Sequence, residues 1–206
     1  MGKAALIIVD VQNDFCEGGS LAVNEAEEIL PVINSLRDKP LFDCVILTCD
    51  WHPLDHCSFA ANHPGAELFT VKKLPDTGVD QMMWPVHCVA HSVGAAFHPQ
   101  LKRCAGDLIV RKGLDKTVDS YSGFGSAPEK TELLQLLKDR GIQTVYTVGL
   151  ATDYCVGSTA LDAAKNGFET YVVLNACRGV AQCTTDSMKQ KLQEANVKII
   201  QSTDVP

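Results

Sequence analysis

The sequence predicts a three-layer α/β/α sandwich, in which helices cover both faces of a central, mostly parallel sheet of six strands. Two features of the chain predict this fold class. Short, continuously apolar runs recur along the chain, as expected for strands that are covered on both faces. Helical segments lie between several of these runs, and alternating strands and helices favour parallel pairing with right-handed crossovers.

Six runs rich in β-branched and apolar residues are the predicted strands. Their apolar residues are mostly continuous along the run, which is why we expect the sheet to be buried between helices. The predicted strands are residues 5–9, 44–49, 108–111, 144–149, 170–174 and 197–201.

Four segments have the character of helices. Residues 27–37 place four apolar side chains on one stripe, and Pro31 predicts that this helix begins shortly before the proline or is kinked there. Residues 128–140 are followed by glycine, and residues 155–166 end at an Asn-Gly pair, both of which are common helix terminators. The fourth predicted helix is residues 186–195.

The segment from about residue 51 to residue 107 breaks this alternation. It contains all six histidines of the chain, and a loop-rich insert of this length inside a compact domain is usually functional. The 206 residues suffice for one large α/β domain and show no composition break. We therefore expect a single domain over residues 1–206, with a histidine-rich insert at about 51–107.

Composition and charge narrow the classes of partner. A net charge of -7 argues against a nucleic acid or an anionic membrane as the partner, because neither is attracted to an acidic surface, so a small molecule is expected. No apolar segment reaches the roughly 18 residues of a membrane span, and the first strand follows Met1 too soon for a signal peptide. The expected location is the cytoplasm.

The nine cysteines form an odd set without a CxxC pair. This pattern indicates neither a disulfide framework nor a zinc site made of thiolates. Most of the cysteines are therefore expected to pack as small, buried apolar residues.

Four reactive side chains stand where apolar runs end: Asp10, Asp50, Lys112 and Cys155. In a parallel sheet, the loops after the carboxyl ends of the strands open onto a common crevice. Carboxylates, an ammonium and a thiol would then face one another, which is the equipment for nucleophilic catalysis.

Cys155 is the predicted nucleophile because it opens a helix after a strand. The helix dipole contributes only about 0.3 to 1 kcal/mol, so we expect Lys112 to be the main cause of a lowered thiol pKa. Asp10 would accept the thiol proton and later return it to a leaving amine. The backbone amides of Ala151 and Cys155 are the predicted oxyanion hole. Taken singly, each side chain has an ordinary structural explanation, whereas together they would require three coincidences at one sheet edge.

The insert supplies a predicted metal site. The side chains of Asp50 and His52 point to the same face of the sheet if the strand continues through them. His87 would then complete a set of one carboxylate and two imidazoles for one divalent metal ion. Such a set suits zinc, and iron or manganese as alternatives. His56 is either a fourth ligand or a residue that holds the ligands in place. Hydrogen-bonded loop residues are expected at the other three positions: His63, His91 and His98.

Five motifs resemble the nicotinamidases of the isochorismatase-like cysteine hydrolase superfamily, and the similarity runs through nearly the whole chain. The motifs are VDVQNDFCEGGSLAV, DWHPLDHCSFAANHPG, WPVHC, RKGLDKTVDSYSGF and GLATDYCV. The resemblance implies an isochorismatase-like fold and hydrolysis of nicotinamide to nicotinate and ammonia, a step of NAD salvage. It also implies a cysteine thioester intermediate and assembly as a homo-oligomer.

The resemblance assigns roles to individual residues. Asp10 matches the proton-shuttling carboxylate, Lys112 the triad lysine and Cys155 the nucleophile. The metal, which in this family binds the pyridine nitrogen and orients the ring, is implied at Asp50, His52 and His87.

The substrate walls are also implied by the resemblance. Phe15, Trp84 and Tyr121 match aromatic residues that sandwich the pyridine ring, and a cis peptide is implied at Leu150-Ala151. The spacer 113–119 is expected to be either a subfamily insertion or a subunit contact.

Other functions and mechanisms are compatible with parts of this site. Isochorismatase-type hydrolases and amidohydrolases of carbamoyl or ureido groups share parts of the site but usually lack the metal set. A metal-bound water could attack the amide and leave Cys155 as a bystander. A protein that only binds a pyridine through its metal is the non-enzymatic alternative.

Overall fold

The computed structural model describes residues 2–206, and its central sheet has six parallel strands in the order β5-β2-β1-β6-β7-β8. Every predicted strand coincides with or overlaps one of them, which confirms the predicted fold class. The strands are β1 (Lys3–Val9), β2 (Phe42–Asp50), β5 (Leu108–Lys112), β6 (Ile142–Leu150), β7 (Glu169–Arg178) and β8 (Lys198–Ile200).

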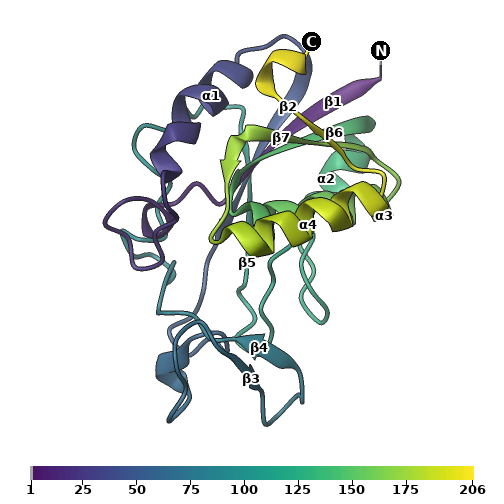
Figure 1. Cartoon of the computed structure of the whole chain (residues 1–206). Coiled ribbons are helices and arrows are strands. Elements are labelled where there is room, and N and C mark those ends of the chain that lie inside the picture. Colours follow the sequence, from purple (N-terminus) through teal and green to yellow (C-terminus); the bar gives the residue numbers. More distant parts are fainter. Residues whose placement is uncertain (1) are drawn as a thin grey trace.

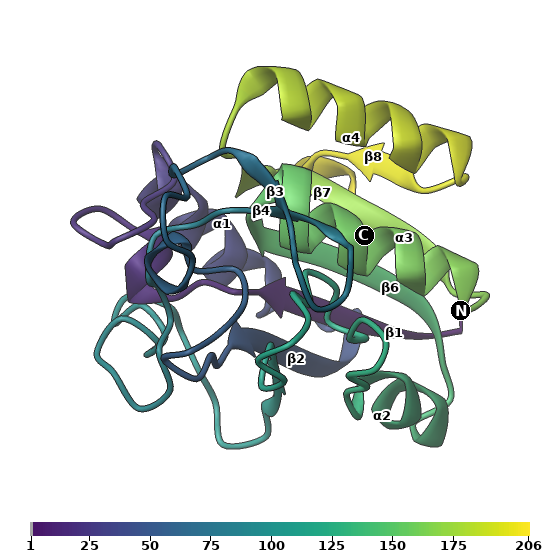
Figure 2. The same cartoon turned by 90° about the horizontal axis from the view of Figure 1, so that it is seen from below.

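Four α-helices cover the sheet in two layers (Figure 2). One face packs against α1, and the other packs against α2, α3 and α4. The helices are α1 (Ile29–Leu36), α2 (Leu133–Asp139), α3 (Gly157–Lys165) and α4 (Gln182–Glu194).

The side chains of β1 explain why its sequence is apolar without interruption. Ala4, Leu6 and Ile8 point into the core beneath α1, whereas Ala5, Ile7 and Val9 point into the core beneath the other three helices. Because successive strand residues face opposite sides, a strand buried on both faces needs an apolar residue at every position.

Two helices differ in extent from the prediction. The α2 helix begins at Leu133, and not at Pro128, because the carboxylate of Glu129 accepts hydrogen bonds from the amides of Gly113 and Leu114 and thereby holds this stretch as a loop. The α4 helix begins four residues before the predicted start. Asp153 fixes this start through tertiary contacts that the local sequence does not reveal: it accepts hydrogen bonds from two amides and one hydroxyl that precede or open the helix.

The insert forms a separate layer at the carboxyl ends of the strands. It contains an antiparallel hairpin, β3 (Val71–Lys73) and β4 (Asp80–Met82), which the sequence did not indicate. Figure 1 shows this hairpin below the sheet, with both chain termini at the opposite end of the molecule. None of the helices within residues 2–206 is long and apolar enough to cross a membrane.

Candidate active site

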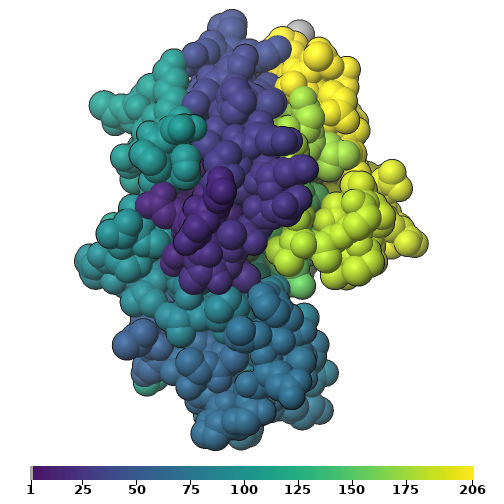
Figure 3. Space-filling view, turned by 60° about the vertical axis from the view of Figure 1, so that its left-hand side comes forward, coloured from purple at the N-terminus to yellow at the C-terminus, as the bar shows by residue number. Residues whose placement is uncertain are grey.

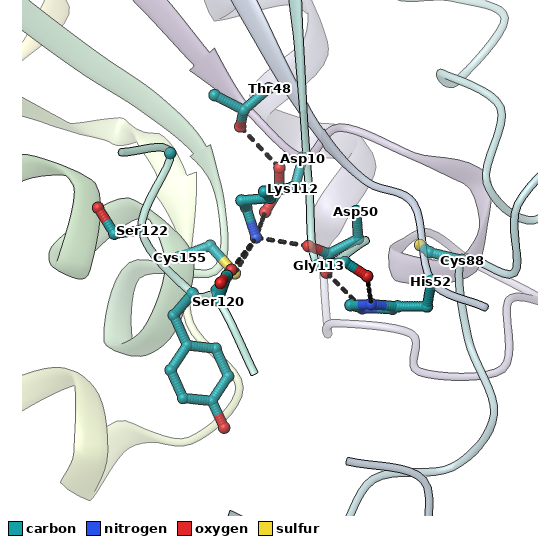
Figure 4. Close-up of polar contacts among 12 residues, drawn as sticks. Asp10, Thr48, Asp50, His52, Cys88, Lys112, Gly113, Ser120, Ser122 and Cys155 are labelled. Atoms are coloured by element: carbon teal, nitrogen blue, oxygen red, sulfur yellow. Dashed lines mark hydrogen bonds and ion pairs between the residues drawn. The ribbon is translucent and has the colours of Figure 1, made fainter. Parts of the chain in front are cut away.

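Lys112 lies at the centre of a buried polar cluster at the carboxyl ends of the strands. The register of β2 and β5 pairs Asp50 directly with Lys112, which places the two side chains side by side. The ammonium nitrogen lies 2.9 Å from Asp10 Oδ2, 2.5 Å from Asp50 Oδ1 and 3.0 Å from the carbonyl oxygen of Ser120. Figure 4 shows this ammonium between the two carboxylates and the sulfur of Cys155. The lysine is fully buried, so two negative charges compensate one desolvated positive charge.

Asp10 directly follows β1 and is fully buried. Its Oδ1 accepts a 2.7 Å hydrogen bond from the hydroxyl of Thr48, which lies in the neighbouring strand β2. Its backbone is in the left-handed region, with φ of 50°, a conformation that costs free energy for a residue other than glycine and is concentrated at functional sites. The strand end and the threonine together fix where the carboxylate points.

Cys155 reaches the same cluster from the other side. It lies in a short π-helical turn, Thr152–Val156, that connects β6 to α3, so the sulfur is at the amino-terminal end of a helical segment. The sulfur lies 3.4 Å from the Lys112 nitrogen, and one ligand-type atom each of Asp10, Asp50 and Cys155 lie within 4.8 Å of one another. The structure therefore brings together the three residues that the sequence nominated for catalysis.

The protonation state of this cluster differs from the sequence-based expectation. Burial raises the pKa of Cys155 well above its ordinary value of 9.0; Lys112 opposes this shift, but Asp10 and Asp50 add to it. Lys112 therefore lowers the thiol pKa as predicted, but the expected net lowering is not found, because burial together with the two carboxylates outweighs the single ammonium. This direction favours the protonated thiol form of Cys155.

Asp10 is the candidate proton acceptor for this thiol. Burial raises its pKa above the ordinary value of 3.8, against the lowering effect of the Lys112 ammonium. The pKa of Asp50 shifts the other way: burial alone would raise it, but Lys112 and the neighbouring histidines lower it. The two carboxylates are thus differentiated, with the proton-accepting character on Asp10.

The predicted metal ligands form a second group that shares Asp50 with the first. Asp50 Oδ2 lies 3.5 Å from His52 Nε2 and 3.9 Å from His87 Nε2. Each of these residues is at most 4% exposed, and one ligand atom from each lies within 4.8 Å of the others. The carboxylate thus directs one oxygen to Lys112 and the other to the imidazoles.

Hydrogen bonds to carbonyl oxygens orient both imidazoles. His52 Nδ1 lies 2.8 Å from the carbonyl oxygen of Gly113, and His87 Nδ1 lies 2.8 Å from that of Pro85. Each Nδ1 therefore carries the proton, and each Nε2 offers a lone pair toward Asp50. Within the described part of the chain, His52 Nε2 is buried without a hydrogen-bond partner, so a divalent metal ion fits this donor set.

Gly113 is required by the close approach of His52. Its φ is +68°, and a Cβ at this position would lie 2.3 Å from Cε1 of the imidazole. The spacer 113–119, for which the sequence suggested a subfamily insertion or a subunit contact, therefore contributes to the site. Its last residue, Asp119, also lines the pocket described below.

The remaining histidines are placed as follows. Both ring nitrogens of His56 are engaged, with Ser58 Oγ at 2.8 Å and the carbonyl oxygen of Val118 at 3.1 Å, and the ring packs 4.1 Å from that of His52. His56 thus lies behind a ligand, and not in the ligand group. Outside the group, His63 and His98 have hydrogen-bonding roles in loops, and His91 packs against Trp51.

A narrow pocket leads from the surface to both groups. The three aromatic residues that the sequence nominated as walls, Phe15, Trp84 and Tyr121, all line it. The indole nitrogen of Trp84 donates a 3.1 Å hydrogen bond to the hydroxyl of Tyr121, which fixes the two rings relative to each other. Cys155 and Asp50 lie among the lining residues, so a ligand in this pocket would contact both groups.

The backbone next to the sulfur borders the same pocket. Ala151 and Cys155, whose amides were nominated as the oxyanion hole, both line the pocket. The peptide bond between Leu150 and Ala151 is cis, as the resemblance implied.

Several residues of the site were missed by the sequence analysis. Tyr154 lines the pocket, and its ring centre lies 4.9 Å from that of Trp84 and 5.3 Å from that of Tyr121. Gln12 is fully buried, and its side-chain amide bonds to both the backbone N-H and the carbonyl of Asp50, which holds the end of β2. The motif VDVQNDF contained a signal for Gln12, since an uncharged polar residue three positions after a buried strand requires a partner if it is buried too.

The sequence and the structure were compared with known proteins. Residues 4–204 match the Isochorismatase domain family. The nicotinamidase of Acinetobacter baylyi is 48% identical over 180 residues, which cover 86% of this chain and 82% of that protein. Among solved structures, the nicotinamidase and pyrazinamidase of Acinetobacter baumanii has a TM-score of 0.93 at 47% identity, covering 100% of this chain and 99% of that one. The pyrazinamidase of Pyrococcus horikoshii, solved in complex with zinc, has a TM-score of 0.80 at 33% identity, covering 97% of this chain and 99% of that one. These matches confirm the resemblance inferred from the motifs, and the chain belongs to the Isochorismatase domain family.

Proposed function

We propose that this protein is an amidohydrolase that converts nicotinamide and water to nicotinate and ammonia. The observation that carries the proposal is the contact of Lys112 with Asp10, Asp50 and Cys155 at the inner end of an aromatic-walled pocket. The similarity to nicotinamidases supports the same reaction.

The proposed reaction uses Asp10 twice. Asp10 takes the proton of the Cys155 thiol, and the sulfur forms a bond to the carboxamide carbon, so that negative charge moves to the amide oxygen. The backbone amides of Ala151 and Cys155 bind that oxygen. The C-N bond then breaks, and Asp10 transfers its proton to the departing ammonia. A water molecule, deprotonated by Asp10, hydrolyses the thioester and releases nicotinate.

Lys112 holds this arrangement together. Its ammonium fixes Asp10 by an ion pair at 2.9 Å and lies close enough to the sulfur, at 3.4 Å, to stabilise the thiolate as it forms. A lysine buried between two carboxylates keeps its charge, because burial is outweighed by the attraction of Asp10 and Asp50, and its pKa lies well above 10.5. It therefore acts as a fixed positive charge, and not as a proton donor.

Asp50, His52 and His87 would hold one divalent metal ion, for which we propose zinc, with iron or manganese as alternatives. The zinc complex of the Pyrococcus horikoshii protein supports this choice. When bound, the ion supplies a Lewis-acidic partner for the pyridine nitrogen and so orients the ring. Phe15, Trp84 and Tyr121 would sandwich that ring, and His56 would support His52 from behind.

The same considerations extend to the setting of the reaction. We propose a single hydrolase domain, because the family match extends over residues 4–204. We propose the cytoplasm as its location, since all nine cysteines are free thiols, as is usual in a reducing compartment. Recovery of nicotinate for NAD synthesis would be its metabolic role.

Release of ammonia from nicotinamide by the purified, metal-loaded protein tests the proposal. Cys155→Ala should abolish turnover, because no thioester can form. Cys177→Ala, which removes a similarly buried thiol outside the pocket, should retain it. Substantial turnover by Cys155→Ala would favour attack by a metal-bound water, and no turnover by the wild-type chain would favour a protein that only binds the pyridine.

A further inference from the structure

A second cluster with metal-ligating side chains lies outside the active site. It consists of Cys16, Glu27 and His98, and one ligand atom from each lies within 4.8 Å of the others. The three residues come from three separate segments: the loop after β1, the short helix Ala26–Glu28 and the insert. Figure 3 shows the loop after β1, in dark purple, against the teal part of the insert at the molecular surface.

The backbone holds these segments together independently of any ion. The amide of His98 donates a 2.9 Å hydrogen bond to the carbonyl oxygen of Val11, which ties the insert to the loop. The amide of Glu17 donates a 2.5 Å hydrogen bond to Glu27 Oε1, which orients that carboxylate and leaves Oε2 available. The cluster is thus largely preformed.

We propose that Cys16, Glu27 and His98 bind a borderline-soft divalent cation such as zinc, at a site separate from the active-site group. A thiolate, a carboxylate and an imidazole are the three ligand types that zinc accepts in proteins, and a water would complete the four-coordinate shell. Cys16 is 1% exposed, whereas Glu27 and His98 are partly exposed, so the ion can reach the thiol from one side. The active-site group of Asp50, His52 and His87 contains no sulfur, and this separates the two sites chemically.

Binding has two chemical requirements. Burial, with the nearby Glu27 carboxylate, raises the pKa of the Cys16 thiol to about 12, so the ion must displace the thiol proton. His98 Nδ1 accepts a hydrogen bond of 3.3 Å from the amide of Gln100. Ligation through Nε2 moves the ring proton to Nδ1 and ends this long contact. Because the ion must displace the thiol proton of Cys16, the affinity of this site for the ion should rise with pH over the neutral range.

Cobalt provides a readout that does not depend on hydrolysis. The metal-free chain is titrated with Co²⁺, and absorption is followed in the near ultraviolet, where charge transfer from thiolate to cobalt is observed. We expect two ions per chain and a thiolate band in the wild type. Cys16→Ser should bind one ion and lose the band, whereas Cys155→Ala and Cys104→Ser should retain both ions and the band.

Two further variants keep the test decisive if Cys16→Ser does not fold. His98→Gln and Glu27→Gln change partly exposed side chains, and each should weaken the sulfur-associated ion at least tenfold while the circular dichroism spectrum is unchanged. A band that persists in Cys16→Ser, a band that disappears in Cys155→Ala, or a wild-type chain that binds cobalt without a thiolate band would each overturn the proposal. A wild-type chain without the band leaves the proposed hydrolysis of nicotinamide unaffected, whereas loss of the band in Cys155→Ala would place an ion on the proposed nucleophile and count against that mechanism as well.

Discussion

The proposed catalytic group of Asp10, Lys112 and Cys155 and the proposed metal group of Asp50, His52 and His87 are adjacent, but they are built in different ways. Asp10 and Lys112 stand at the carboxyl ends of β1 and β5, the two parallel strands that flank β2, and the register of β2 with each of them aligns the two side chains. His52 and His87 lie in irregular segments, and each needs a hydrogen bond from its Nδ1 to a carbonyl oxygen to hold its ring. A sheet edge thus positions reactive groups through the register of its strands, whereas a loop must supply a polar contact for each group.

Asp50 belongs to both groups and couples them. One oxygen pairs with Lys112, and the other faces His52 and His87. Asp50 is therefore the residue through which a change of charge in one group would reach the other. The variants below test how far the two groups can be separated.

Replacing Lys112 by methionine should have the largest effect. The ammonium is fully buried between Asp10 and Asp50, and its removal leaves two neighbouring carboxylates without compensation. Removing one partner of a buried ion pair typically costs about 3 to 5 kcal/mol of stability. We expect Lys112→Met to lose all turnover and to unfold at a markedly lower urea concentration.

The pH dependence of stability provides a second check on Lys112. Its folded-state pKa is above its ordinary value of 10.5, so its contribution is fully present below that pH and is lost as the pH rises above it. The wild type should lose stability in this alkaline range, and Lys112→Met should lose less.

Lys116→Met, which changes an exposed lysine paired with Asp55, should leave the urea midpoint nearly unchanged. Equal midpoints for both variants would contradict the assigned role of Lys112.

Replacing His52 by alanine should separate the two groups. Loss of an outer contact to a metal ligand typically costs 10- to 100-fold in affinity, so loss of a direct ligand should cost on the order of 100-fold or more. Metal content and nicotinamide turnover should both fall. The rate at which an alkylating agent modifies Cys155 should change little, because His52 makes no contact with the thiol in the structure.

His91→Ala is the matched control for His52, since it removes an exposed imidazole of the same insert that packs against Trp51. It should retain metal and turnover. If alkylation of Cys155 slowed in parallel with metal loss in His52→Ala, the two groups would be one unit, and the comparison between them would fail.

Much of the fold and the positions of the catalytic residues could be predicted from the sequence, for a physical reason. The buried strands are continuously apolar, so their ends are visible as the points where Asp10, Asp50 and Lys112 interrupt the pattern. Parallel pairing then brings these ends together without any knowledge of the loops. Cys155 could be predicted for the same reason, because it lies one turn beyond the end of β6.

The properties that depend on three-dimensional neighbours could not be predicted. The pKa of Cys155 is set by its burial and by the balance of one ammonium against two carboxylates, and the sequence gives neither quantity. Thr48 is an unremarkable strand residue until its hydroxyl is placed 2.7 Å from Asp10. The short hairpin of β3 and β4 has three residues per strand, too few to give a periodic signal.

Replacing Trp84 by phenylalanine should have a moderate effect that is confined to binding. The variant keeps an aromatic wall but loses ring area and the 3.1 Å hydrogen bond to Tyr121. A loss of about 1.4 kcal/mol, within the range for one aromatic contact, corresponds to about a tenfold higher KM. The value of kcat should change little. Trp51, the other tryptophan of the chain, lies outside the pocket, so Trp51→Phe should leave KM unchanged. A fall in kcat with constant KM would place Trp84 in the chemical step.

The smallest effect is expected from Thr48→Val, which tests the catalytic group alone. The Thr48 hydroxyl lowers the pKa of Asp10, against the raising effect of burial, so its removal should raise that pKa further. A hydrogen bond to a charged group contributes about 1.5 to 3 kcal/mol, so the loss of this bond should raise the pKa of Asp10 measurably. Asp10 must be ionised to accept the thiol proton, so kcat/KM falls as the pH drops through its pKa, and this fall should begin at higher pH in the variant. Thr147→Val removes a buried hydroxyl that bonds to the Tyr171 carbonyl, away from Asp10, and should leave the profile in place. An unshifted pH profile of kcat/KM in Thr48→Val would mean that the fall at acidic pH reports the titration of a group other than Asp10. The metal ligands would then be the next residues to test.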